Sequence, residues 1–146
     1  MSFGNASVSR GRRPVPGSRC PCGSGSAFAS CCGPALDGSP PPTASALMRS
    51  RYTAFTLGDA AYLRSSWHPA TRPDRLEIDD DLEWVRLDIA EVEGGRDEDV
   101  RGTVTFRAHW RHTSSGERGV LSETSRFRRS DGRWVYLDGV DGGRSV

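Results

Sequence analysis

The chain has 146 residues, a net charge of +1, 27% charged residues and 35% hydrophobic residues. A chain of this length forms one domain with a real core and has room for a small appendage. Because the net charge is near zero and no long block carries one sign, composition gives no reason to expect a nucleic-acid or membrane partner.

The first nineteen residues contain four arginines, no acid and no run of seven apolar residues. This pattern fits neither a secretory signal nor a membrane span, so we expect a cytoplasmic protein that does not associate with membranes. Residues 1–18 are predicted to be a disordered basic tail. Contact of its arginines with nucleic acid is the less favoured alternative.

All four cysteines lie in the stretch CPCGSGSAFASCCG, at Cys20, Cys22, Cys31 and Cys32. Disulfides are disfavoured in a reducing cytoplasm, and inert buried cysteines would be spread along a core-facing pattern instead of standing among Gly, Ser and Pro. The remaining interpretation, which we favour, is a metal site that stabilises a segment too short for its own apolar core. Four thiolates indicate Zn(II), with an iron-sulfur cluster as the alternative.

The spacing of the cysteines suits a tetrahedral site. One rigid proline separates the first two, and the eight residues between Cys22 and Cys31 allow the chain to turn back. Gly23 and Gly25 permit positive φ angles there. Phe28 is expected to pack over the site or against the next domain. Because all four ligands come from the protein, the zinc is predicted to be structural.

The pattern CPCGSG followed by CCG resembles the SEC-C motif, the zinc knuckle found at the C-terminus of the SecA translocation ATPase and in many bacterial proteins. The resemblance covers residues 19–34. Ser26 stands where the motif often has lysine.

The next segment, GPALDGSPPP, is rich in Gly and Pro and is predicted to contain no helix, with residues 35–42 as a linker. Thr43 can cap a helix that Gly58 ends, and Asp59 can cap a second helix over residues 60–67, with His68 and Pro69 after it.

The remainder is predicted to form antiparallel strands. Alternating apolar residues indicate strands at 83–93 (through Val85, Leu87 and Ile89), 102–112, 119–129 and 133–139, and Asp131-Gly132 is the firmest hairpin signal. Helices followed by a meander indicate an α+β fold, with the helices on one curved face of the sheet.

This order resembles the cone of nuclear transport factor 2 and the SnoaL-like enzymes. The segments LMRSRYTAF, GDAAYL, SWHP, SETSRF and GRWVYLDG, read with the knuckle, are similar to the YchJ-like family of bacterial proteins. The resemblance implies a cone-shaped antiparallel sheet with the helices packed on its concave face, a domain at 43–140 and a disordered tail at 141–146. Proteins of this fold often dimerise through the outer face of the sheet, so a homodimer is one expectation.

The resemblance also implies a pocket in the cone, for which we name these lining residues: Tyr52, Trp67, His68, Phe106, Trp110, Glu123 and Ser125. His68 is a candidate general base and Glu123 a candidate acidic partner. The competing interpretations are a histidine bonded to the backbone and a Glu123 that forms a structural ion pair. Arg49, Arg51 or Arg107 could supply that pair.

A closed metal site without an evident catalytic constellation favours a non-enzymatic adaptor. Its knuckle would dock on a protein or ribonucleoprotein partner beside the pocket. The alternative is a small-molecule hydratase or isomerase that uses His68 and an acidic residue in the cone.

Overall fold

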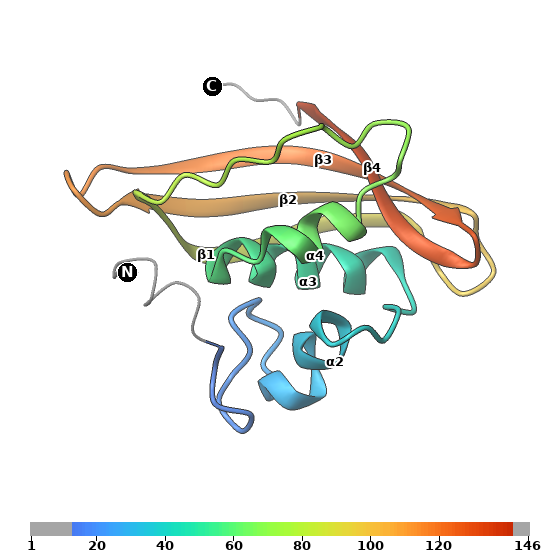
Figure 1. The fold of residues 1–146 in the computed structure, drawn as a ribbon, viewed down its shortest axis with the longest axis horizontal. Helices are drawn as coiled ribbons and strands as arrows, with labels where there is room; N and C mark the ends of the chain where they lie inside the picture. Colours follow the sequence, from blue (N-terminus) through green and yellow to red (C-terminus); the bar gives the residue numbers. More distant parts are fainter. Residues whose placement is uncertain (1–12, 142–146) are drawn as a thin grey trace.

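The computed structural model of the chain describes residues 13–141 (Figure 1). Short helices come first and a four-stranded antiparallel sheet follows. The elements are η1 (Phe28–Ser30), α2 (Cys32–Leu36), α3 (Ala44–Leu57), α4 (Ala60–Ser65), β1 (Leu82–Gly94), β2 (Arg101–His112), β3 (Arg118–Ser130) and β4 (Arg133–Asp141). The predicted α+β class is confirmed.

Helix α3 has the boundaries that its capping residues predict. The Thr43 side chain accepts a hydrogen bond from the Ala46 N–H, which satisfies one of the free donors of the first turn. Gly58 ends the helix in the left-handed conformation, with φ of 73°.

Helix α4 begins at the predicted cap but is shorter than expected. The Asp59 carboxylate accepts from the Tyr62 N–H, and the helix ends at Ser65 instead of residue 67. The reason is tertiary: Trp67 forms a parallel bridge with Tyr136 of β4, and the His68 N–H donates to the Tyr136 carbonyl at 2.7 Å. Pairing with the sheet therefore replaces the last helical turn.

The prediction that residues 33–42 contain no helix is wrong for the first part of this stretch, because α2 extends to Leu36. Pro34 is the third residue of α2, within the first turn, where a backbone N–H has no partner inside the helix and proline therefore breaks no bond. The helix ends before the proline run, which forms the connection to α3.

The four strands pair in chain order, β1-β2-β3-β4. The β3–β4 hairpin turns at Asp131 and Gly132, which have φ of 54° and 83°. Two successive positive φ angles are typical of the type I′ turn, and the strongest hairpin signal of the sequence thus lies at a tight turn.

A bulge in β1 overturns part of the predicted alternation. The register of β1 on β2 shifts between Trp84 and Arg86, so Val85 faces outward and is 49% exposed. Trp84 takes the inward position instead and packs against the core, together with Ile89. An inserted residue of this kind reverses the facing of the positions before it, which a strict period of two cannot represent.

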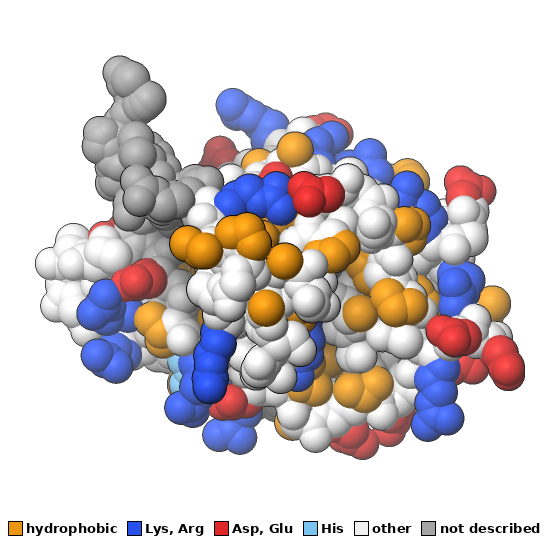
Figure 2. All heavy atoms as spheres, turned by 90° about the horizontal axis from the view of Figure 1, so that it is seen from below, with side chains coloured by type: hydrophobic (Ala, Val, Ile, Leu, Met, Phe, Trp, Pro, Cys, Tyr) orange, Lys and Arg blue, Asp and Glu red, His pale blue; other side chains and the backbone are white. Residues whose placement is uncertain are grey.

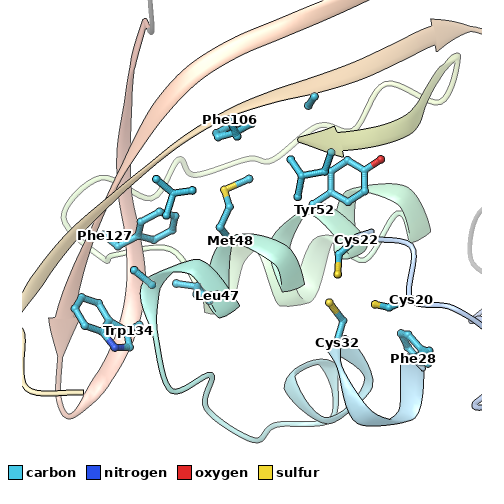
Figure 3. Close-up of a cluster of buried hydrophobic side chains, with 14 residues drawn as sticks. Cys20, Cys22, Phe28, Cys32, Leu47, Met48, Tyr52, Phe106, Phe127 and Trp134 are labelled. Carbon is cyan, nitrogen blue, oxygen red and sulfur yellow. The ribbon is translucent and has the colours of Figure 1, made fainter. Parts of the chain in front are cut away.

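Helix α3 lies between the cysteine segment and the sheet. In Figure 1 the segment before α3 lies on one side of this helix and the strands lie on the other. In the close-up, Met48 and Tyr52 extend from α3 toward the sheet, whereas Cys20, Cys22 and Cys32 lie on its opposite side (Figure 3). These cysteines belong to the same continuous hydrophobic core as Leu47, Phe106, Phe127 and Trp134. The cysteine segment is thus integrated with the cone.

The two predicted disordered tails fall largely outside the described residues, namely 1–12 of the first and 142–146 of the second. Residues 13–18 contact the cysteine segment. Arg13 pairs with Asp37 at 3.0 Å, and the Pro16 carbonyl accepts from the Ala29 N–H at 3.0 Å.

Replacing Thr43 with Ala should lower the free energy of unfolding by about 1 kcal/mol, because the first turn of α3 loses its side-chain acceptor. Urea denaturation followed by circular dichroism measures this change. Thr43→Ser keeps the oxygen and should remain close to wild type. Equal stabilities for the Ala and Ser variants would show that the cap contributes nothing.

Candidate metal centre and cone cavity

The sulfur atoms of Cys20, Cys22, Cys31 and Cys32 all lie within 4.8 Å of one another, and Cys22 Sγ is 3.6 Å from Cys31 Sγ. A tetrahedron of thiolates about 2.3 Å from a zinc ion has sulfur-sulfur edges of about 3.8 Å. Figure 3 shows the sulfurs of Cys20, Cys22 and Cys32 converging beside α3. The four cysteines are free of disulfides and can hold a metal ion.

A small loop and two short helical segments bring the cysteines together. Cys20 donates its N–H to the Ser26 carbonyl and accepts one from the Gly23 N–H. Gly23 and Gly25 have φ of 83° and 93°, the positive values predicted for the turn. Residues 28–30 then form η1, and the chain enters α2 at Cys32.

Phe28 closes the inner side of this loop. Its side chain is 4% exposed and belongs to the core cluster that contains three of the cysteines. The guanidinium of Arg13 lies over its ring at 5.4 Å from the centroid. Phe28 therefore packs beside the sulfur cluster, and this contact helps to seal the site.

Helix α3 supplies polar partners to the sulfur atoms. The Thr53 hydroxyl donates to Cys32 Sγ at 3.3 Å and lies 3.8 Å from Cys20 Sγ. Arg49 donates to the Cys22 carbonyl at 2.9 Å, with its Nη1 3.8 Å from Cys22 Sγ. Four thiolates around a divalent cation carry a double negative charge, which the Arg49 guanidinium and the Thr53 hydroxyl would partly offset.

The clustered cysteines shift the pKa values of one another's thiol groups. Thiol groups of Cys20 and Cys32 donate toward Cys22 and hold the pKa of Cys22 well below its ordinary value. Contacts of Cys32 with Cys20 and with Cys22, together with burial, raise the pKa of Cys32. Burial first, and then the proximity of Cys22, raises the pKa of Cys31. Four thiols this close cannot all ionise alone, whereas a bound cation would stabilise all four thiolates.

A second feature is a cavity of about 170 Å³ between α3 and the concave face of the sheet. Six aromatic side chains line it: Tyr52, Phe55, Trp67, Trp84, Phe106 and Tyr136. The aliphatic lining residues are Met48, Ala108 and Leu121, and the polar ones are Arg51, Glu123 and Ser125.

Arg51 is a buried cation on the wall of this cavity, with only 4% of its surface exposed. Its Nη1 donates to the Leu63 carbonyl at 2.8 Å and to Ser66 Oγ at 2.6 Å. Its guanidinium lies 4.4 Å from the ring centroid of Tyr136 and 5.0 Å from that of Trp67. Burial lowers the pKa of Arg51 to about 10, so the group keeps its charge at neutral pH.

Glu123 lies on β3 among the cavity residues. Its Oε2 accepts from the Ser125 hydroxyl at 3.4 Å, and its carboxylate occupies the space that a Cβ at Gly139 would need. Of the arginines named as partners, Arg51 shares the cavity, where the charge of Glu123 opposes the lowering of the Arg51 pKa by burial. Arg49 instead contacts Cys22, and Arg107 is exposed.

Five of the seven predicted pocket residues line the cavity, namely Tyr52, Trp67, Phe106, Glu123 and Ser125. His68 does not, because its backbone is tied to β4 and its Nδ1 accepts from the Ala70 N–H at 3.0 Å. Trp110 does not either. A Cβ at Gly119 would overlap the Trp110 ring, so this ring lies over Gly119 on β3, away from the cavity.

Some lining residues and both sulfur partners were not predicted from the sequence. Met48 and Phe55 recur at helical spacing with the predicted Tyr52 along α3, and all three line the cavity. Arg49 and Thr53, four residues apart, lie on the other side of the helix against the cysteines. The four-residue spacing of Arg49 and Thr53 places them on one side of a helix, and this is visible in the sequence. Only the position of the cysteine loop in the structure shows that this side contacts the cysteines.

Comparison with known proteins supports the family and the fold. Residues 43–139 match the YchJ-like family model described as "YchJ, middle NTF2-like domain". A UPF0225 protein of Chromobacterium violaceum is 48% identical over 126 residues, covering 83% of this chain and 91% of that protein. A UPF0225 protein of Streptomyces coelicolor is also 48% identical, over 86% of this chain and 97% of that protein.

Two solved structures have the same fold. The solution structure of a SEC-C motif containing protein from Rhodopseudomonas palustris superposes with a TM-score of 0.73 at 33% identity, covering 83% of this chain and 96% of that chain. The crystal structure of a SEC-C motif containing protein from Psychrobacter arcticus gives a TM-score of 0.67 at 23% identity and supports the fold alone. Within residues 13–141, no helix has the length and apolar character needed to cross a membrane.

The structure predicts a role for Thr53 in metal binding. Wild-type protein should bind one Zn(II) per chain under reducing conditions. Thr53→Val should weaken zinc affinity about tenfold, because partners of metal ligands typically contribute 10- to 100-fold. Competition with a chromophoric chelator measures this change. The matched control is Thr56→Val in the next turn, since the Thr56 hydroxyl donates to the Thr53 carbonyl and not to sulfur. A zinc stoichiometry near zero would contradict the metal site itself.

Proposed function

As a member of the YchJ-like family, with a SEC-C cysteine cluster packed against an NTF2-like cone, this chain is, we propose, a non-enzymatic binding protein. Its cone cavity takes up a small molecule with a mostly apolar body. Its cysteine cluster holds a structural Zn(II) ion.

The observation that carries this proposal is the cavity itself. It measures about 170 Å³, and aromatic and aliphatic side chains form most of its wall. Apolar cavities of about 150 Å³ engineered into proteins take up benzene. Small-molecule sites typically combine such a wall with a few polar groups, and Arg51, Glu123 and Ser125 provide these here.

The placement of His68 weighs against the hydratase or isomerase alternative. That alternative needs a base and a carboxylate that converge on the reacting molecule. Glu123 lines the cavity, but His68 lies outside its wall and accepts from the backbone of Ala70. The geometry therefore supports binding over acid-base chemistry.

Zinc is the proposed metal because all four donors are cysteine sulfurs that lie within 4.8 Å of one another, close enough to surround one tetrahedral ion. With four protein ligands the ion has no free position for a substrate. Its role would be to hold residues 19–34 against α3, the helix that also carries Arg51 and Tyr52 into the cavity. In this way the metal would stabilise the wall of the ligand site from behind.

A second proposed function is docking of the knuckle on a protein or ribonucleoprotein partner. The observation that favours it is the exposure of Arg19 and of residues 23–26 outside the sulfur cluster. Figure 2 shows the molecule from this side, where apolar side chains are scattered and both basic and acidic side chains lie around them. The exposed positive charge of Arg19 would suit a partner with acidic groups.

Filling the cavity should abolish uptake of an apolar probe. Ala108 is 3% exposed and lines the cavity, so Ala108→Leu places three more carbons there. Wild-type protein should bind toluene saturably, and Ala108→Leu should reduce the affinity at least tenfold, as measured by ligand-observed NMR. Ala90→Leu, at an exposed position of β1, is the control and should bind like wild type. Absence of saturable binding to the wild type would refute the cavity function.

Docking can be tested without disturbing the metal. Arg19→Glu reverses an exposed charge beside the cysteine loop and leaves all four ligands in place. Partners that the wild type captures from a lysate of the source bacterium should be lost with Arg19→Glu and retained with Arg75→Glu, an exposed control far along the chain. Nuclease treatment separates ribonucleoprotein from protein partners. Identical partner lists for all three proteins would count against docking.

A further inference from the structure

Arg51 brings a positive charge to the wall of the cone cavity. The side chain is 4% exposed, and the ion pairs formed among residues 13–141 do not include it. Burial lowers the pKa of Arg51, and Glu123 has the smallest effect of the three groups that oppose this lowering. A buried charge is costly unless an opposite charge compensates it. Arg51 therefore favours an anion in the cavity.

One edge of the Arg51 guanidinium is accessible. Within residues 13–141 its hydrogen bonds come from Nη1, which donates to the Leu63 carbonyl and to Ser66 Oγ. In the same part of the chain, the buried side-chain nitrogens and oxygens that have no partner are Trp67 Nε1 and Arg111 Nε. Nε and Nη2 of Arg51 are not among these atoms, so they keep accessible surface. Because Arg51 lines the cavity, we place this edge at the cavity.

Aromatic rings cover the Arg51 guanidinium and hold its plane. The guanidinium carbon lies 4.4 Å from the ring centroid of Tyr136 and 5.0 Å from that of Trp67, and both rings line the cavity. Nε–H and Nη2–H of an arginine point in parallel and match the two oxygens of one carboxylate. A neutral amide offers this edge a single oxygen and no charge. The geometry therefore favours a carboxylate over a neutral polar group.

The carboxylate of Glu123 is directed toward β4. Its Oε2 accepts from the Ser125 hydroxyl at 3.4 Å and occupies the position that a Cβ at Gly139 would take. Arg51, by contrast, lies on α3. The small effect of Glu123 on the pKa of Arg51 is consistent with this placement. Glu123 thus leaves most of the positive potential of Arg51 available to a ligand.

We infer that the cavity binds a small monocarboxylate with an apolar body. The carboxylate accepts from Nε and Nη2 of Arg51, and the apolar body packs against Tyr52 and Phe106. A cavity of about 170 Å³ has room for one ring or a short chain, since an engineered cavity of about 150 Å³ holds benzene. This inference rests on the proposed ligand-binding function of the cavity and specifies its ligand class.

Four probes with the same ring test the ligand class. Benzoate carries the negative charge, benzamide has a similar shape without charge, toluene has no polar group and benzylamine is a cation. Titration calorimetry at neutral pH with the full-length, zinc-loaded protein should give benzoate at least tenfold tighter than benzamide and toluene. Toluene or benzamide that binds as tightly as benzoate would overturn the inference and leave the cavity function intact. Benzylamine as the tightest probe would also overturn it, and no binding of any probe would refute both.

Two variants test the contact. Arg51→Gln removes the charge and keeps a side-chain N–H for the Leu63 carbonyl, so benzoate should bind no tighter than benzamide. Toluene binding shows that this variant has kept its cavity, and a benzoate preference that persists would overturn the inference. Glu123→Gln removes a negative charge at similar size, so it should strengthen benzoate about threefold and leave toluene unchanged. Weaker benzoate binding to Glu123→Gln would overturn the inference even where the Arg51 variant fails to fold.

Discussion

The contact between the cysteine cluster and helix α3 is the constraint on which the rest of the molecule depends. Residues 19–34 are too short to bury a core of their own, and α3 alone could cover only one layer. On one side of α3, Thr53 and Arg49 donate hydrogen bonds to the cysteine segment. On the other side, Met48 and Tyr52 face the sheet. One helix therefore contacts the sulfur cluster on one side and forms part of the cavity wall on the other.

The buried Arg51 is the second organising group. Its Nη1 bonds to the Leu63 carbonyl and the Ser66 hydroxyl fix the end of α4 relative to α3. Its planar face packs against Trp67 and Tyr136, which join α4 to β4. A buried guanidinium of this kind costs desolvation, which its hydrogen bonds and ring contacts only partly offset. A cation kept at this position is consistent with a role in recognition as well as in structure.

Local chemistry explains which elements were predicted correctly. The caps at Thr43 and Asp59 and the turn at Asp131-Gly132 depend only on residues close in sequence, and each was found where predicted. The errors arose where distant residues compete. Pairing of Trp67 with Tyr136 shortened α4, and a bulge reversed Val85. The same contrast between local and distant contacts holds for the site. The spacing of the four cysteines predicts their cluster, which the structure confirms. The predictions that Trp110 and His68 line the cavity are wrong, because these positions depend on distant contacts.

The sequence by itself determined the α+β class, the family and the set of four clustered cysteines, because caps, alternation and cysteine spacing each depend on residues that lie close together in the sequence. Only the tertiary structure decided that the cysteine loop packs behind α3 and that Arg51, instead of Arg49 or Arg107, shares the cavity with Trp67 and Glu123. These residues come from three separate parts of the chain. Their meeting depends on sheet register and helix packing, which are set by the burial of the whole core and not by any local pattern.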